Sequence, residues 1–298
     1  MAKRKKLTGI EHLENNPINW FPGHMNKAIQ EIKSNIKLVN IIIEVRDARA
    51  PMVSGNKGNY SHAGDKPYLI VFNKTNLADP KAVKIWQDWL TKKEESFIFI
   101  NALDKSVIKQ IVKKAKEILL THRLKSNPDA TDKDDIKMMI IGLPNTGKST
   151  IINQLSNRNA SKAAATPGQT KQKLWVKVDQ NISIIDTPGV MPPKIEKEVH
   201  GMWLSAIHAI PDHITTPDYS ACFLIEYFLK KKSEDFKSFY EFESLDIDLI
   251  TAVNHIGKRR GCLRKGGDYD YDHIYKIILA DFRAGSLGLI CFELPPIK

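Results

Sequence analysis

The stretch Gly142-Leu143-Pro144-Asn145-Thr146-Gly147-Lys148-Ser149-Thr150 decides the fold of this chain, because it has the spacing of a phosphate-binding loop. A short apolar run precedes it and a helical pattern follows it, which is the context that such a loop requires. Backbone N–H groups and the start of the helix would hold phosphate oxygens there. Lys148 would reach the β and γ oxygens of a nucleotide, and the Ser149 hydroxyl would bind magnesium. The predicted nucleotide contacts are Asn145, Thr146, Gly147, Lys148, Ser149 and Thr150.

Short apolar runs around this loop predict the surrounding sheet. They lie at 41–45, 68–72, 97–100, 138–141 and 182–185, and each ends in a turn or loop signal. Continuous apolar character is typical of parallel strands that are covered on both faces. Helical patterns alternate with these runs, around 24–37, 80–93, 104–120 and 148–156. The alternation predicts a doubly wound α/β domain.

Changes in composition suggest where the domains begin and end. Residues 121–135 lose apolar content and gain Pro, Asn and Asp, which predicts a linker inside the sheet domain. After Pro192-Pro193 apolar residues recur at helical spacing, and a strand is expected only at 289–292. We therefore expect a basic flexible arm at 1–19, an α/β domain at 20–194 and a mostly helical domain at 195–298.

A second motif, Asp186-Thr187-Pro188-Gly189, follows the apolar run at 182–185. An Asp at the carboxyl end of a strand would reach the magnesium shell, and the Gly189 N–H would sense the γ-phosphate. Thr170 is the candidate that completes magnesium coordination when a γ-phosphate is present, and Thr166 is the alternative. The predicted magnesium ligands are Ser149, Thr170 and Asp186.

A base-reading loop is predicted at Asn73-Lys74-Thr75-Asn76, directly after the apolar run at 68–72. Lys74 would lie along a purine ring, Asn73 would link this loop to the phosphate loop, and Asn76 would face the guanine edge. Asn101-Ala102, after the run at 97–100, would add a backbone N–H to the guanine oxygen. These residues favour GTP as the ligand.

Together these motifs resemble those of the TRAFAC-type GTPases in circularly permuted order, with the base loop before the phosphate loop. The chain is also similar to the ribosome biogenesis GTPase A family in segments that include Trp20-Phe21-Pro22-Gly23-His24-Met25, Asp47-Ala48-Arg49-Ala50-Pro51, Pro167-Gly168-Gln169-Thr170 and Lys258-Arg259-Arg260-Gly261. The resemblance covers nearly the whole chain. It implies a circularly permuted P-loop GTPase domain at 20–194, a helical RNA-binding domain at 195–298 and a role in late assembly of the bacterial large ribosomal subunit.

The resemblance also suggests roles for two single residues. Val190 stands where many GTPases carry a Gln that orients the attacking water, and Val cannot do so. The family offers His24 as the catalytic group, and an imidazole can accept or relay a proton near neutral pH. Asn145 is implied to support a potassium ion near the phosphates. A purely structural role is the alternative for both His24 and Asn145.

One residue departs from the family pattern. Asp is usual where Asn76 stands, because a carboxylate accepts two hydrogen bonds from the guanine edge, whereas an amide has one acceptor oxygen. Leaving one such buried group unpaired costs about 1–3 kcal/mol. Weakened guanine selectivity is therefore expected.

The formal net charge of +11 favours a polyanionic partner, either nucleic acid or an anionic membrane surface. Basic clusters at 230–232 and 258–265 point to rRNA phosphates, with a solvated basic face as the alternative. Tyr269, Tyr271 and Tyr275 would either stack on bases or pack within the domain. No run of eighteen apolar residues and no apolar signal core is present, so a cytoplasmic protein without a membrane partner is expected.

Cysteine usage agrees with a reducing compartment, because Cys222, Cys262 and Cys291 are scattered and lack metal-ligand spacing.

Two other functions compete with a ribosomal GTPase. A nucleotide-gated protein adaptor would make the basic surface incidental. A P-loop kinase would have no need for Asn73-Lys74 or for Asp186-Thr187-Pro188-Gly189.

Overall fold

The computed structural model describes residues 23–55, 66–131, 135–156, 175–192, 195 and 197–296. They form two compact units. The described residues of the sheet unit fall within 21–193 and 291–298, and those of the helical unit fall within 194–290. The sequence predicts one helical domain up to residue 298, whereas the segment from Cys291 belongs to the sheet unit. The basic arm predicted at 1–19 lies outside the described residues.

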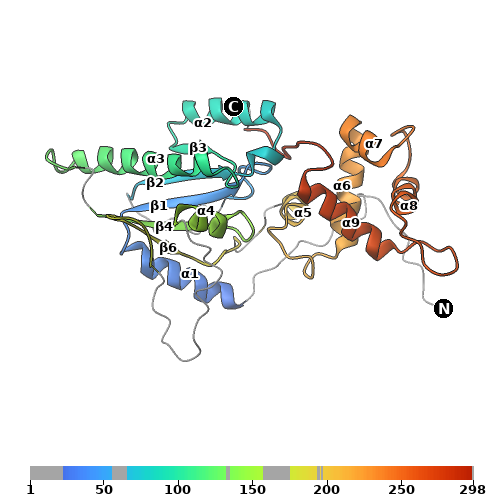
Figure 1. Cartoon of the computed structure of the whole chain (residues 1–298), viewed down its shortest axis with the longest axis horizontal. Coiled ribbons are helices and arrows are strands. Elements are labelled where there is room, and N and C mark those ends of the chain that lie inside the picture. The colour runs from blue at the N-terminus through green and yellow to red at the C-terminus, as the bar shows by residue number, and fades with distance from the viewer. Residues whose placement is uncertain are drawn as a thin grey trace. The chain divides into compact units, whose positions relative to one another are not determined.

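The sheet unit contains, among its described residues, a six-stranded sheet in the order β3-β2-β1-β4-β6-β5. The strands are β1 (Ile41–Asp47), β2 (Tyr68–Asn73), β3 (Phe97–Phe99), β4 (Ile136–Gly142), β5 (Trp175–Asp179) and β6 (Ile182–Asp186). β1 pairs in parallel with β2 and β4, β2 with β3, and β4 with β6. The apolar runs therefore form parallel strands with helices around them, which confirms the predicted α/β class (Figure 1).

β5 is a strand that the apolar runs do not predict. It pairs antiparallel with β6 at the edge of the sheet, and most of its residues are partly or fully exposed. Its charged positions, Lys177 and Asp179, are common on an edge strand, where they oppose pairing with another chain. Such a strand lacks the continuous apolar character of a strand buried on both faces, so that criterion overlooks it.

Helices cover both faces of the sheet, because successive strand residues point to opposite faces. The helices of this unit are α1 (Gly23–Ile36), α2 (Pro80–Lys92), α3 (Lys105–Leu124) and α4 (Lys148–Leu155), with a short 3-10 helix, η3 (Thr75–Leu77). In β1, Ile41, Ile43 and Val45 pack in the cluster that contains α3 and α4 residues. Ile42 faces the other side and packs with α1, and Phe72 of β2 packs with α2.

α3 continues beyond its predicted end and takes up the first part of the predicted linker at 121–135. Its buried positions run from Ile108 to Leu119 at helical spacing, so its core face is regular. Beyond them the last turn is exposed and basic, with His122 and Arg123, and positive charge is favoured at the end of a helix. Polar composition therefore marks an exposed helix end as well as a linker.

The helical unit is a bundle of short helices. They are α5 (Glu198–Ala206), α6 (Pro217–Lys231), α7 (Glu234–Tyr240), α8 (Leu249–Arg259) and α9 (Tyr271–Ala284). Ser233, Asp248 and Asp270 cap the N-termini of α7, α8 and α9 by accepting a backbone N–H. The strand expected at 289–292 does not form. Instead, the Phe292 N–H donates a hydrogen bond to the carbonyl of Arg49 in the sheet unit.

Candidate nucleotide-binding site

The predicted motifs meet at one edge of the sheet, where the parallel strands β2, β4 and β6 end. The base loop follows β2, the phosphate loop follows β4, and the Asp186 turn follows β6. Ligands of open α/β sheets bind at the carboxyl ends of the strands. The three motifs can therefore form one site, although the base loop precedes the phosphate loop along the chain.

The phosphate loop has a backbone that only particular residues tolerate. Asn145 and Gly147 have positive φ values of 59° and 101°. A Cβ atom on Gly147 would lie 2.2 Å from Nδ2 of Asn73, which leaves no room for a side chain. The Thr146 hydroxyl donates to the carbonyl of Leu143 at 3.0 Å, a hydrogen bond within the loop that stabilises its conformation. The loop is thus shaped by its own residues and by the base loop.

Lys148, the first residue of α4, has its ammonium group turned into the phosphate loop. The residue is only 7% exposed, and Nζ donates to the carbonyls of Gly142 at 3.2 Å and Leu143 at 2.8 Å. Burial lowers the pKa of Lys148 to about 8, and the charge of Asp186 partly offsets this effect. Neutral carbonyls satisfy its hydrogen bonds without compensating its charge. Phosphate oxygens would supply that compensation.

The turn after β6 lies directly against the phosphate loop. A Cβ atom on Gly189 would come within 2.7 Å of the backbone nitrogen of Pro144. The Thr187 hydroxyl donates to the carbonyl of Ile140 at 2.6 Å, and the Val190 N–H donates to the carbonyl of Gly142 at 3.3 Å. The two loops therefore form a continuous wall. The Val190 side chain is fully buried, in agreement with the expectation that it does not orient water.

Ser149 and Asp186 fit the chemistry of a magnesium site. Both residues are exposed, and hydroxyl and carboxylate oxygens are ligands that this ion accepts. Protein atoms around the carboxyl group of Asp186 displace water and raise its pKa, whereas the nearby charge of Lys148 lowers it. Thr170 and its alternative Thr166 lie outside the described residues. The backbone of His24 lies in the first turn of α1, but its side chain is also outside the described part.

Asn73 joins three loops through one side chain. Its Nδ2 donates to the carbonyl of Thr146 at 2.9 Å, and its Oδ1 accepts the N–H groups of Lys74 at 2.8 Å and Ala102 at 2.9 Å. The amide therefore uses its donor and acceptor ends on different segments, and a carboxylate could not do so. Base loop, phosphate loop and the loop after β3 are thereby held in one geometry.

The loop after β3 carries Asn101-Ala102, which is predicted to add a backbone N–H to the guanine oxygen. In the structure the Ala102 N–H donates to Oδ1 of Asn73. The Oδ1 atom of the neighbouring Asn101 accepts the N–H of Leu103 at 3.0 Å. Through these hydrogen bonds both residues shape the base side of the site.

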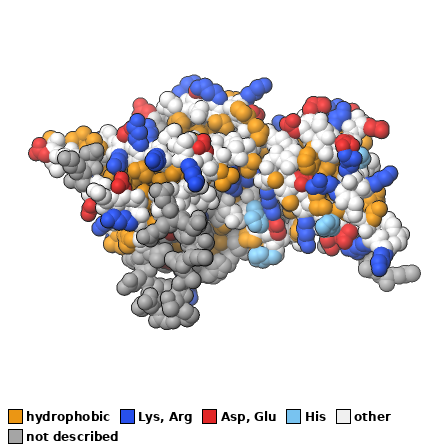
Figure 2. All heavy atoms as spheres, in the orientation of Figure 1, with side chains coloured by type: hydrophobic (Ala, Val, Ile, Leu, Met, Phe, Trp, Pro, Cys, Tyr) orange, Lys and Arg blue, Asp and Glu red, His pale blue; other side chains and the backbone are white. Residues whose placement is uncertain are grey.

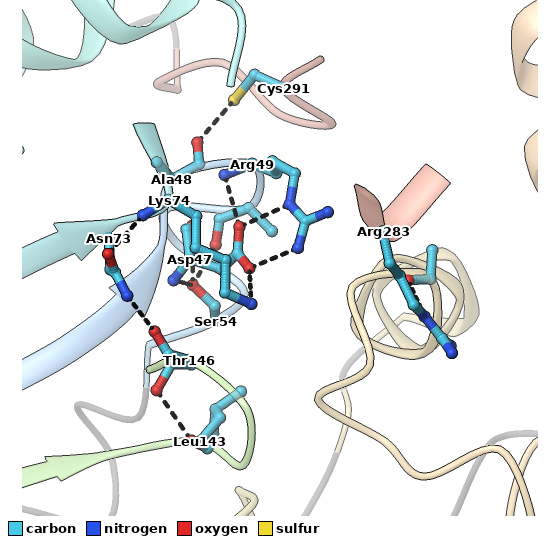
Figure 3. Close-up of polar contacts among 12 residues, drawn as sticks. Asp47, Ala48, Arg49, Ser54, Asn73, Lys74, Leu143, Thr146, Arg283 and Cys291 are labelled. Atoms are coloured by element: carbon cyan, nitrogen blue, oxygen red, sulfur yellow. Dashed lines mark hydrogen bonds and ion pairs between the residues drawn. The ribbon is translucent and has the colours of Figure 1, made fainter. Parts of the chain in front are cut away.

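Lys74 is held by a buried carboxylate that lies outside the predicted site residues (Figure 3). Its Nζ is 3.0 Å from Oδ2 of Asp47, which also binds the Arg49 guanidinium at 2.8 Å. Burial alone would raise the pKa of Asp47, but the charges of Arg49 and Lys74 and their hydrogen bonds hold it far below its usual range. The only sequence signal for Asp47 was its place in the family-like segment 47–51.

Thr75 and Asn76 stand beside Lys74 in η3. The Thr75 N–H donates to the carbonyl of Ile100 at 3.1 Å, which ties η3 to the end of β3. Lys74 adopts the left-handed conformation, with φ of 64°, and so turns the chain from β2 into η3. Asn76 is exposed, and its side chain forms no hydrogen bond within the described part of the chain. Its amide is therefore available to a ligand.

The basic clusters of the helical unit are largely paired with acids. Figure 2 shows blue and red side chains intermingled over this unit. The pairs include Lys232 with Asp246, Arg259 with Glu241, Arg260 with Asp281 and Arg264 with Asp270. Lys231 lies over the ring of Tyr227, and Lys258 and Lys265 are exposed.

The three tyrosines are not equivalent. Tyr275 is only 4% exposed, which corresponds to the packing alternative, whereas Tyr269 and Tyr271 are partly exposed.

Among the described helices, none is long and apolar enough to cross a membrane.

The chain is similar in sequence and structure to known proteins. Residues 137–255 match the 50S ribosome-binding GTPase family, a stretch that starts in β4 and leaves out the base loop that precedes it. The chain is 35% identical to ribosome biogenesis GTPase A of Bacillus licheniformis over 278 residues, or 93% of this chain and 98% of that protein. It is 33% identical to mitochondrial ribosome-associated GTPase 1 of Mus musculus, covering 92% and 89% of the two chains. The solved GNP-bound structure of YlqF from T. maritima superposes with a TM-score of 0.62 at 27% identity, over 90% of this chain and 98% of that chain.

Proposed function

Because the chain belongs to the ribosome biogenesis GTPase A family and is a GTP hydrolase with the expected permuted fold, we propose that it acts during late assembly of the large ribosomal subunit. It binds GTP at the edge of the sheet and binds rRNA through its helical unit. The site of action is the cytoplasm. The observation that carries the proposal is the side chain of Asn73, which joins the base loop to the phosphate loop.

The phosphate side supplies charge to the nucleotide. Lys148 donates to the β and γ oxygens in place of the carbonyls of Gly142 and Leu143. Ser149 and Asp186 would hold magnesium, together with Thr170 when the γ-phosphate is present. Magnesium held there would neutralise charge that develops on the γ-phosphoryl group. The Gly189 N–H contacts the γ-phosphate, so the turn after β6 responds to nucleotide state. Asn145 supports potassium beside the phosphates.

His24 is the proposed catalytic group, because Val190 is buried against the α1 side of the sheet and cannot orient water. Substitution of His24 by Ala is expected to lower the rate of GTP hydrolysis about a hundredfold, as for loss of a general base, and to leave GDP affinity nearly unchanged. Single-turnover hydrolysis on large-subunit particles measures this rate. A rate equal to that of the unchanged chain would remove His24 from the mechanism.

The decisive experiment measures GTP turnover with and without immature large ribosomal subunits. Strong stimulation is expected, together with GTP-dependent binding to the particles that weakens steeply as salt rises. Small ribosomal subunits serve as the control. Equal turnover with both particles would contradict the proposed partner.

A protein adaptor is the second candidate, because the ion pairs of Arg259, Arg260 and Arg264 neutralise part of the basic surface. An adaptor would bind its partner with little dependence on RNA. Nuclease treatment of the particles distinguishes the two functions, since only rRNA binding is lost when the exposed RNA is digested.

A further inference from the structure

The last part of the chain, residues 291–296, returns to the sheet unit after the helical unit. This C-terminal segment lies beside α2 in Figure 1. The Phe292 N–H donates to the carbonyl of Arg49 at 2.8 Å, and the indole N–H of Trp86 donates to the carbonyl of Glu293 at 3.0 Å. Phe292 is 9% exposed. The segment therefore contacts the sheet unit through its backbone hydrogen bonds and through the buried side chain of Phe292.

Glu293 makes the contact that distinguishes this attachment from simple packing. Its Oε1 accepts the backbone N–H groups of Met52 at 2.6 Å and Val53 at 2.9 Å, across 241 and 240 positions of sequence. Burial raises the pKa of Glu293, and these hydrogen bonds and the charge of Arg46 oppose that rise. A carboxylate that accepts two backbone N–H groups fixes the turn that carries them.

The turn held by Glu293 follows the carboxylate that pairs with the base loop. It starts at Asp47, whose carboxylate binds Lys74 and Arg49. The Ser54 hydroxyl closes it by donating to the carbonyl of Ala50 at 2.6 Å and accepting the N–H of Asp47 at 2.9 Å. The C-terminal segment reaches the same turn at Ala48, through the thiol of Cys291 at 3.7 Å (Figure 3). A continuous series of contacts thus runs from the C-terminal segment to Lys74.

We propose that the C-terminal segment is a positioning element of the nucleotide site: Glu293 fixes the turn at 48–54 and thereby sets, through Asp47, the orientation in which Lys74 meets the base. The inference rests on the proposed role of Lys74 in base binding. Coupling is reciprocal, so a nucleotide that binds Lys74 also strengthens the attachment of the segment.

The test compares three variants of the full-length chain. Glu293→Ala is expected to raise the GDP dissociation constant and the KM for GTP about fivefold to tenfold, a typical size for coupling between sites, with kcat changed little. Glu293→Gln keeps an oxygen at the Oε1 position and is expected to bind GDP almost as the unchanged chain does. Leu294→Ala, at an exposed neighbour in the same segment, is the control.

A double-mutant cycle separates positioning from general stability. In a Lys74→Ala background, Glu293→Ala is expected to have little further effect on GDP affinity, because the side chain that it positions is gone. Additive effects, or an unchanged affinity in Glu293→Ala with normal GTP turnover, would overturn this inference and leave the proposed function standing. Absence of GDP binding in the unchanged chain would overturn both.

A second measurement needs no substitution and so does not depend on a variant that folds. Hydrogen exchange at the amides of Met52 and Val53 is expected to slow when GDP is added, because both amides donate to Glu293. Equal exchange with and without GDP would contradict the coupling.

Discussion

The base half and the phosphate half of the nucleotide site differ in how their charges are compensated. In the base half, Lys74 and Arg49 share the carboxylate of Asp47, whose pKa is held far below its usual range. In the phosphate half, the buried ammonium of Lys148 contacts neutral carbonyls, and burial lowers its pKa to about 8. In the base half, the buried charges of Asp47 and Arg49 therefore compensate each other without a ligand. In the phosphate half, the charge of Asp186 offsets the burial of Lys148 only in part, and a bound anion would complete the compensation.

This difference separates the residues that stabilise the fold from those that bind nucleotide. Removing one partner of a buried ion pair strongly destabilises the fold, because the remaining charge loses its counter-charge. A buried charge that is only partly compensated, such as Lys148 with Asp186, lowers the stability of the free protein and strengthens binding of an anion. Substitutions in the phosphate half should therefore mainly lower nucleotide affinity, and substitutions in the base half should mainly lower the free energy of unfolding.

Lys148→Ala should give the largest effect on binding. GDP affinity is expected to fall about a hundredfold to a thousandfold, the size seen when a preorganised charge contact is removed. The midpoint of thermal unfolding of the nucleotide-free protein should stay the same or rise, because a desolvated charge is lost. Calorimetric titration and thermal unfolding measure the two quantities. Lys137→Ala, at an exposed lysine of β4, is the matched control. A marked loss of stability in Lys148→Ala would contradict the contrast between the halves.

Asp47→Asn should give the largest effect on stability. The Arg49 guanidinium, 2% exposed, would lose the carboxylate that it binds, at a cost of about 3–5 kcal/mol in the free energy of unfolding. Urea unfolding measures this cost. Asp88→Asn is the control, because its ion pair with Lys84 is exposed and should contribute under about 1 kcal/mol.

The contribution of Asp47 to the free energy of unfolding also depends on pH in a defined way. The pKa of its carboxyl is lower in the folded protein than the ordinary value of 3.8, so the folded state binds fewer protons at this group. The stabilisation is present above about pH 3.8 and is lost as the pH falls below it. Stability that is equal in Asp47→Asn and the unchanged chain at pH 7 would refute the assignment of counter-charge to this residue.

Asn76→Asp should sharpen base recognition without affecting the phosphate half. A carboxylate accepts both donors of the guanine edge, so GTP is expected to gain about tenfold in affinity over xanthosine triphosphate relative to the unchanged chain. Competition against labelled GDP measures the ratio. An unchanged ratio would show that residue 76 does not face the base.

Asn145→Gly should have the smallest effect. Glycine tolerates the positive φ of this position, so only the side chain is removed. Stimulation of GTP hydrolysis by potassium over sodium is expected to fall several-fold, with the rate in sodium unchanged, because a cation site would lose one oxygen ligand. Equal loss in both salts would indicate a structural role for Asn145.

The sequence predicts the phosphate half better than the base half, for a physical reason. Lys148, Ser149 and Gly147 are neighbours along the chain, so their spacing reports their geometry directly. The ion pair of Asp47 with Lys74 and the hydrogen bonds of Glu293 join segments that only the folded sheet brings together. Strand β5 was missed because its exposed edge lacks a continuous apolar run. Strands and helices with regular buried faces, such as β1 and α2, were predicted closely.

The return of residues 291–296 to the sheet unit makes the helical unit an insertion rather than an appended domain. An appended domain hangs from one covalent hinge and can reorient about every axis. An inserted one enters and leaves its host at separate points of the chain, here near residue 193 and near residue 291. Such a connection restricts rotation. The helical unit therefore has two covalent connections to its host, and one of them leads directly from the turn after β6.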